Sequence, residues 1–164
     1  MRVFTRLAFA VFALAVTAPA ASAHGLAAAP RVLRVLEVPE GFTPLTPTDF
    51  TKSIKAGDAF AYVQGLYTWS GGGKGQRIGH LDGTCQIISN VSAEGAGKAY
   101  CVAHAFLPGG EILFQGIQPF TAGLSHYRYP ITGGTGTYAT VRGWVAIRDL
   151  SETGKTADVF HVVM

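Results

Sequence analysis

The stretch ITGGTG, residues 131–136, admits two incompatible structures, and the choice between them decides the fold. A TGGTG run can form the phosphate-binding turn of a dinucleotide enzyme, where a strand passes into a helix and exposes backbone N–H groups. It can equally form a glycine-rich corner between two β-strands. The first structure predicts a redox enzyme, and the second does not.

The residues after this stretch exclude the dinucleotide-binding structure. Such a fold places its glycine turn after the first strand and then needs a helix and a further parallel strand. Here Gly136 is followed by only 28 of the 164 residues. The next segment, TYATVRGWVAIRDL (137–150), has β-branched and aromatic residues without an apolar stripe of helical period. The sequence therefore predicts a β-corner with no nucleotide site.

The composition supports an all-β fold. Charged residues make up 14% of the chain, well below the roughly 25% of a typical soluble domain. The 21 glycines occur together with frequent Val, Ile, Thr, Tyr and Phe. Chains of this kind place glycines at corners and wherever strands crowd together.

Alternating patterns and turn residues predict about eight strands and no helix. The proline at position 39 is expected to end the first strand, because it has no N–H for a ladder. Residues 39–58 contain three prolines, Pro39 included, and show no sustained period, which predicts a long ordered loop or lid. The expected strands cover residues 31–38, a segment from 59 onward, 78–89, 98–106, 111–120, 124–131, 138–149 and 157–163.

The first 23 residues have the pattern of a secretory signal peptide. Arg2 and Arg6 precede an apolar run over residues 7–16, and Ala21-Ser22-Ala23 supplies small residues for cleavage. The apolar run is too short to span a bilayer, which disfavours an uncleaved membrane anchor. We therefore expect a secreted protein of one domain, residues 24–164, with no membrane association after cleavage near Ala23.

Charge and motif spacing exclude several partners. Removing residues 1–23 removes two arginines and no acid, so the net charge falls from +3 to +1, with 11 Lys+Arg against 10 Asp+Glu. No basic run with interleaved aromatics is present, so nucleic acid is not an expected partner. The five histidines lack metal-ligand spacing such as H-x-H, and no G-x-S-x-G signature occurs. We expect no metal and no cofactor.

Four motifs occur in the order and spacing of the allene oxide cyclase barrel superfamily, which the chain resembles over residues 31–163. That superfamily includes the plant allene oxide cyclases and the dirigent proteins. The resemblance implies an eight-stranded antiparallel β-barrel with a central apolar cavity, assembled as a homotrimer. In such a barrel one side-chain parity of each strand faces the interior. The motifs are GDAFAYVQGLYT (57–68), GTC (83–85), Gln115-Gly116 and ITGGTGTYATVRG (131–143).

The resemblance also carries over some cavity residues. The glutamate on the first strand of allene oxide cyclases is matched by Glu37, and the cysteine of their G-x-C motif is matched by Cys85. Their two cavity asparagines are replaced by Pro39 and Gln64. The tyrosine shortly after their Gln-Gly pair is missing, and Gln118 lies in that region. The resemblance thus extends to the fold and to part of the cavity, but not to one particular reaction.

Side-chain parity identifies further candidates. Leu33, Val35 and Glu37 share one face of the first strand, and Arg34 on the other face makes the Glu37 face the better inward candidate. A carboxyl in a dry cavity has a raised pKa and can act as an acid or base, whereas an outward Glu37 would simply be solvated. On the next strand, core packing alone would explain Phe60 and Leu66, so Tyr62 and Gln64 are its stronger ligand candidates. The ligand-binding candidates are Phe60, Tyr62, Gln64, Leu66, Gln115 and Gln118.

Cys85 and Cys101 are the only two cysteines, and they flank one predicted hairpin turn. In an exported chain this arrangement predicts a disulfide. The alternative is a free cavity thiol at Cys85, which the match to allene oxide cyclases implies.

The sequence therefore predicts a secreted barrel that encloses a small, mostly apolar molecule. One hypothesis is a cyclase or isomerase in which the cavity shape and Glu37 hold a reactive substrate in one conformation. A second is a non-catalytic carrier of a hydrophobic small molecule. A third is a secreted protein that acts through its surface as a trimer.

Overall fold

The computed structural model describes residues 29–51, 53–70, 73–92, 96–120, 125–150 and 154–164. The predicted signal peptide lies outside these described residues. Within them, no helix has the length and apolar character needed to cross a membrane.

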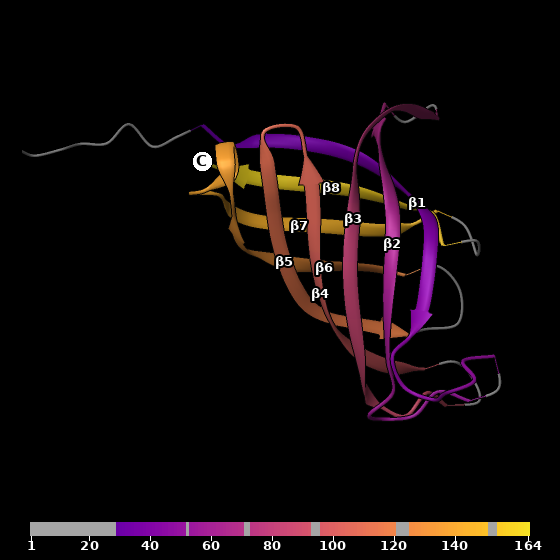
Figure 1. Ribbon diagram of the computed structural model, residues 1–164. Helices are drawn as coiled ribbons and strands as arrows, with labels where there is room; N and C mark the ends of the chain where they lie inside the picture. Colours follow the sequence, from indigo (N-terminus) through magenta and orange to yellow (C-terminus); the bar gives the residue numbers. More distant parts are fainter. Residues whose placement is uncertain (1–28, 52, 71–72, 93–95, 121–124, 151–153) are drawn as a thin grey trace, which may run out of the picture.

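Eight antiparallel strands close into a barrel, in which each strand pairs with its neighbours in the sequence and the first pairs with the last (Figure 1). One 3₁₀ turn, η1 (Gly136–Tyr138), is the only helical element in the described part of the chain. The predicted all-β, eight-stranded barrel is confirmed. The strands are β1 (Arg31–Pro44), β2 (Ala59–Trp69), β3 (Lys74–Ser89), β4 (Gly97–Leu107), β5 (Gly110–Phe120), β6 (His126–Gly134), β7 (Arg142–Asp149) and β8 (Thr156–Val163).

The first strand continues past Pro39, so the prediction that it ends there was wrong. β1 pairs with β2 as far as Pro44, and a register shift between Pro39 and Gly41 leaves Glu40 as an extra residue. Such a β-bulge tolerates a proline, because ladder pairing is interrupted at that point. The connection to β2 is correspondingly shorter and covers residues 45–58.

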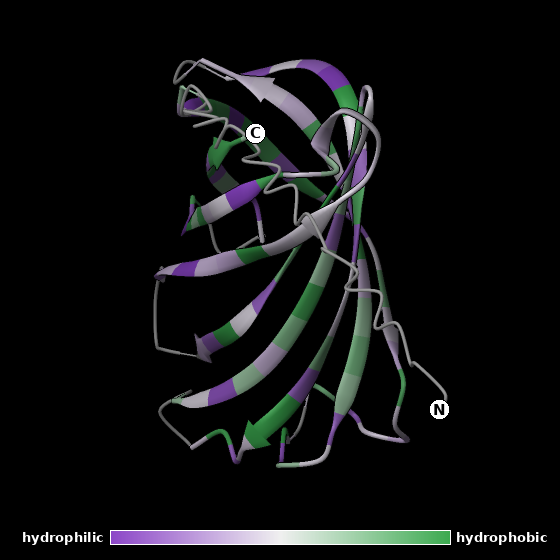
Figure 2. Cartoon of the chain, turned by 90° about the vertical axis from the view of Figure 1, so that its left-hand side faces the viewer, coloured by the Kyte–Doolittle hydropathy of each residue, from purple (hydrophilic) through white to green (hydrophobic). Residues whose placement is uncertain are grey.

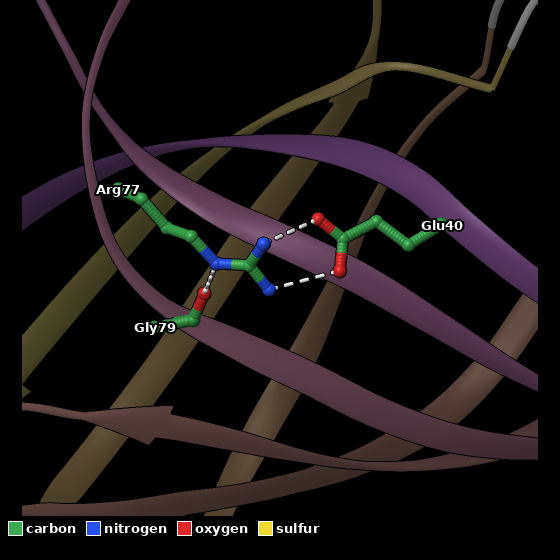
Figure 3. Close-up of polar contacts among 3 residues, drawn as sticks. All are labelled: Glu40, Arg77 and Gly79. Carbon is green, nitrogen blue, oxygen red and sulfur yellow. Dashed lines mark hydrogen bonds and ion pairs between the residues drawn. The ribbon is translucent and has the colours of Figure 1, made fainter.

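The bulged residue is tied to β3 by a bidentate ion pair (Figure 3). Arg77 donates from Nη1 to Glu40 Oε1 at 2.8 Å and from Nη2 to Oε2 at 2.9 Å, and its Nε donates to the Gly79 carbonyl at 3.2 Å. The Glu40 carboxylate lies over Gly65 of the intervening β2, where a Cβ would collide with it. An exposed pair of this kind stabilises the fold by at most about 1 kcal/mol, but its geometry fixes the direction of the bulge.

The glycine stretch is a corner between two antiparallel strands, as predicted. Gly136 has a φ of +57°, and a Cβ there would collide with the Gly109 carbonyl in the turn between β4 and β5. The Thr137 N–H donates to the same carbonyl at 2.8 Å. Because these contacts draw residues 136–138 into η1, β7 begins at Arg142 and not at the predicted residue 138.

We expect the corner to bind no nucleotide, because antiparallel β7 follows it in place of a helix and a parallel strand. Titration with NAD, NADP and ATP should leave the melting temperature unchanged, since a ligand that binds the native state raises it by mass action. A saturable rise with any of the three would contradict this interpretation.

Hydrophobic and hydrophilic residues alternate along most strands, which gives the barrel an apolar interior (Figure 2). Cys85 and Cys101 face each other across β3 and β4, are both buried, and form a disulfide. The predicted bridge is confirmed, and the alternative of a free thiol at Cys85 is wrong. The largest fully buried apolar side chains of the core include Leu66, Leu81, Ile87, Ile112, Phe114 and Phe160.

Candidate functional site

A cavity of about 260 Å³ occupies the half of the barrel where β1 ends and β2 begins. Its volume equals that of about nine water molecules at liquid density. The other half is filled by the inward side chains of the core, such as Val35, Leu66 and Phe160, which are fully buried. Phe42 lines the cavity and is 53% exposed, so the cavity reaches the surface at this rim.

Aromatic side chains form much of the cavity wall, and two of them lie against glycines of the family motifs. A Cβ at Gly83 would overlap the Tyr62 ring, and a Cβ at Gly116 would overlap the Tyr129 ring. The glycines of GTC and of the Gln-Gly pair therefore make room for cavity tyrosines. The six aromatic residues of the lining are Phe42, Phe60, Tyr62, Phe114, Tyr127 and Tyr129.

A pair of buried carboxyls lies at the inner wall, joined by one threonine. Glu37 on β1 is 3% exposed and Asp158 on β8 is fully buried. The Thr156 hydroxyl lies 3.1 Å from Glu37 Oε2 and 2.9 Å from Asp158 Oδ1. Since this hydroxyl has a single proton, it can donate to only one of them at a time. The other two carboxyl oxygens, Glu37 Oε1 and Asp158 Oδ2, have no hydrogen-bond partner outside this pair.

Burial raises the pKa of both carboxyls. The pKa of Asp158 lies well above its usual range, first through burial and then through the neighbouring charge of Glu37. Burial also raises the pKa of Glu37, but a hydrogen bond from Asp158 opposes the rise. Two neighbouring buried carboxyls do not both ionise readily, so the pair favours one shared proton, which also accounts for the two oxygens without another partner.

We expect Asp158→Asn to stabilise the protein at neutral pH. A carboxyl whose pKa is raised by folding binds its proton more tightly in the native state, so the free energy of unfolding falls as the pH rises above the ordinary values of 3.8 for Asp158 and 4.5 for Glu37. The amide keeps the shape and a donor for Glu37, and should add about 1–3 kcal/mol near neutrality, since each pKa unit corresponds to about 1.4 kcal/mol.

Melting curves across the acid-to-neutral range measure this effect, with the exposed outer-wall variant Asp82→Asn as the control. The gain from Asp158→Asn should shrink toward zero near the ordinary pKa of the carboxyls. Equal stability of this variant and the wild type at neutral pH would contradict the assigned environment.

The structure brings most of the predicted site residues together. Glu37 faces inward, as its parity predicted, and it lines the cavity together with Phe60, Tyr62, Gln64 and Gln118. Their roles in binding or catalysis stay predictions. The side-chain oxygen of Gln64 and the hydroxyl of Tyr129 are buried without a hydrogen-bond partner.

Two predicted residues lie elsewhere. Leu66 is fully buried in the packed core and is not part of the cavity lining. Gln115 alternates with the inward Phe114 and pairs with Val102 of β4, so its side chain belongs to the outer face. The direction of a side chain follows from the alternation of residues along the strand, and not from membership of the Gln-Gly motif. We leave Gln115 out of the proposed site.

Several cavity residues were not predicted from the sequence. Thr156 lines the cavity and shares the inward parity of β8 with Asp158 and the core residue Phe160, and Asp158 is a lone acid in an apolar strand. That signal is the same one that identified Glu37. Tyr127 and Tyr129 alternate with exposed polar residues in HYRYP (126–130), so their inward direction could also have been inferred.

The connection between β1 and β2 is ordered and packs at the cavity rim. Phe50 contacts Phe42 and Phe60 edge to face, with ring centroids 5.4 and 5.6 Å apart. Asp58 closes the base of this loop by accepting from Thr48 Oγ1 at 2.5 Å and from the Lys55 N–H at 2.8 Å. Of the loop predicted over 39–58, residues 39–44 belong to β1, and the described residues 45–51 and 53–58 form the connection.

Arginines that are distant in the sequence gather on the outer face of β6, β7, β8 and β1. Arg34 of β1 and Arg128 of β6 lie in one cross-strand row. The row runs from Arg34 through Val159 of β8 and Ala146 of β7 to Arg128. Arg128 lies 4.4 Å from the centre of the Trp144 ring. Strand pairing thus places arginines from distant segments on one outer face, with a tryptophan beside Arg128. The absence of a nucleic-acid partner stays a prediction.

In the described ranges, no three His, Cys, Asp or Glu residues are grouped as metal ligands. The fold is a closed eight-stranded β-barrel with an aromatic-walled cavity and a buried carboxyl pair at its inner wall. Residues 45–163 match the family model of the allene oxide cyclase barrel like domain, and the chain belongs to that family. No curated protein matches the chain.

Solved structures share this fold at low sequence identity. A pyocyanin demethylase is 24% identical with a TM-score of 0.63, over 80% of this chain and 99% of the other. AbnU, an exo-specific intermolecular Diels-Alderase, is 18% identical with a TM-score of 0.64, over 83% and 99%. The pterocarpan synthase dirigent protein PsPTS1 is 16% identical with a TM-score of 0.62, over 84% and 95%. These likenesses establish the fold.

Proposed function

We propose that this protein binds a small, mostly apolar molecule in the barrel cavity and converts it as a cyclase or isomerase without a cofactor. The observation that carries the proposal is Glu37, a buried carboxyl whose Oε1 has no partner beyond the hydrogen bond that Glu37 shares with Asp158. An anion in a dry, aromatic-walled cavity is costly unless a ligand uses it, and such groups concentrate at functional sites.

In this proposal Glu37 acts as the base or the electrostatic partner of the reacting atoms. The hydrogen bond from Asp158 opposes the rise in the Glu37 pKa that burial causes, and in its ionised form Glu37 can accept a proton from a bound substrate. The aromatic walls hold the substrate in a folded conformation, while Gln64 and Tyr129 offer unpaired polar atoms that orient it. No covalent intermediate is required.

The solved relatives support this class of function, because they include Diels-Alderases and a dirigent protein, which act on small molecules. We further propose that the protein is secreted, from the signal-peptide pattern of residues 1–23, and that it assembles as a homotrimer, from the family resemblance. A carrier of a hydrophobic molecule would use the same cavity, and its walls alone would account for binding.

Native mass spectrometry of the protein incubated with an extract of its own source tests cavity binding and reports the oligomer at the same time. Two tryptophan variants on one strand form a matched pair. Gln118→Trp fills the cavity, whereas Gln115→Trp adds the same ring on the outer face. We expect a bound molecule in the wild type and in Gln115→Trp, and none in Gln118→Trp. Equal binding by both variants, or no bound molecule in the wild type, would count against the proposal.

A further inference from the structure

The cavity lining combines aromatic faces with acids and contains no described cation. Six aromatic side chains contribute to it, together with the carboxyls of Glu37 and Asp149. No lysine, arginine or histidine is among the described lining residues, although arginines are abundant on the outer face. Aromatic faces carry negative potential, and such walls attract organic cations.

The unpaired polar atoms of the cavity are mostly acceptors. The side-chain oxygen of Gln64 and the Tyr129 hydroxyl are buried without a hydrogen-bond partner, and Glu37 Oε1 and Asp158 Oδ2 have no partner outside their own pair. A neutral hydrocarbon would leave these atoms unsatisfied, and an anion would add repulsion. A ligand with positive charge or with N–H donors would satisfy them.

The groups that face Glu37 from the other strands add no positive charge. Asp158 and Thr156 face it from β8, and Tyr62 faces it from β2. The β6 tyrosines 127 and 129 and Asp149 of β7 complete the set of titratable neighbours. Burial, followed by the charge of Glu37, raises the pKa of Tyr62 and keeps it neutral. The described lining therefore supplies carboxyl groups and no basic side chain to balance them.

From these observations we infer that the substrate is a compact organic cation, such as an aromatic quaternary ammonium ion or a protonated cyclic amine. The inference rests on the proposed function of this cavity and specifies its substrate class. The positive centre contacts the Glu37 carboxylate and the aromatic faces, and the apolar remainder fills the cavity. Binding of a cation also favours loss of the proton shared by Glu37 and Asp158.

Two compounds of the same shape and different charge test the inference. Phenyltrimethylammonium and tert-butylbenzene differ by replacement of the quaternary nitrogen with carbon. In titration calorimetry with the wild-type protein, we expect the cation to bind about tenfold more tightly or better, as desolvated cation–π and carboxylate contacts allow. The affinity of the cation should rise from about pH 5 to about pH 8 with release of protons, while that of the neutral compound stays flat.

Variants assign this selectivity to Glu37. Glu37→Gln should reduce the cation-to-neutral affinity ratio by about fivefold or more, because the amide keeps the shape and removes the charge. Asp82→Asn removes one acid from the outer wall, where its side chain is 52% exposed, and should leave the ratio unchanged. The pH dependence of the wild type provides the same information should Glu37→Gln fold poorly.

The outcomes separate this inference from the proposed function. If tert-butylbenzene binds as tightly as phenyltrimethylammonium, or more tightly, the cavity binds apolar molecules but the cationic class is wrong. If neither compound binds the folded protein, the proposed function of the cavity fails together with the inference. A selectivity that persists in Glu37→Gln and shows no pH dependence would also overturn the inference.

Discussion

Glu37→Gln should lower turnover of the cavity's substrate by roughly 100-fold or more, the usual worth of an acid–base group. Glutamine keeps the size of the side chain and an acceptor for the Thr156 hydroxyl, but it removes the base. The fold should stay intact, because replacing a buried charge by a neutral group of the same shape removes a desolvation cost. Single-turnover rates with the substrate found in native mass spectra measure the effect, with melting curves as the check on folding.

The same variant separates an enzyme from a carrier. In a carrier, Glu37→Gln changes affinity by at most about 1–3 kcal/mol, and there is no turnover to lose. Glu111→Gln is the matched control, because Glu111 lies at the start of β5 and contacts His104 instead of the cavity. Unchanged affinity and an unchanged rate in Glu37→Gln would remove Glu37 from the site, and with it the main argument for catalysis.

The direction of Glu37 could be predicted because it depends on a local rule. Side chains alternate across a strand, and Arg34 on one face left the Glu37 face to the interior. The corner at residues 131–136 was predictable from length alone, since no crossover fits into the remaining chain. Both inferences need only neighbouring residues or a count of residues.

The features that were missed depend on contacts between distant segments. Pro39 stays in β1 because a bulge forms opposite Gln64, and Arg77 then binds the bulged Glu40. No local pattern at Pro39 contains that information. Arg34 and Arg128 likewise share one outer row only because pairing through β8 and β7 joins β1 to β6. Pairing between strands therefore creates both features.

Removal of the disulfide should destabilise the protein by about 3 kcal/mol, because the bridge closes a loop of roughly 15 residues in the unfolded chain. The two cysteines are 16 positions apart and directly opposed in the β3–β4 ladder. The double variant Cys85→Ala with Cys101→Ala should lower the melting temperature by on the order of 10 °C for a domain of this size. Denaturant unfolding of the oxidised and reduced wild type measures the same quantity without substitution.

Intact-mass analysis of alkylated protein shows whether the bridge is present before it is removed. Without prior reduction we expect no alkylated thiol, and two alkylated thiols would contradict the pairing.

Loss of the disulfide should also affect the cavity wall. Cys85 pairs with Phe60 in the β2–β3 ladder, and Cys101 pairs with Gly116, which makes room for the Tyr129 ring. A bridge that only restrains the unfolded chain leaves ligand affinity in the folded double variant unchanged. A bridge that also holds the cavity wall in place gives weaker binding there, so affinity measured well below the melting temperature distinguishes the two roles.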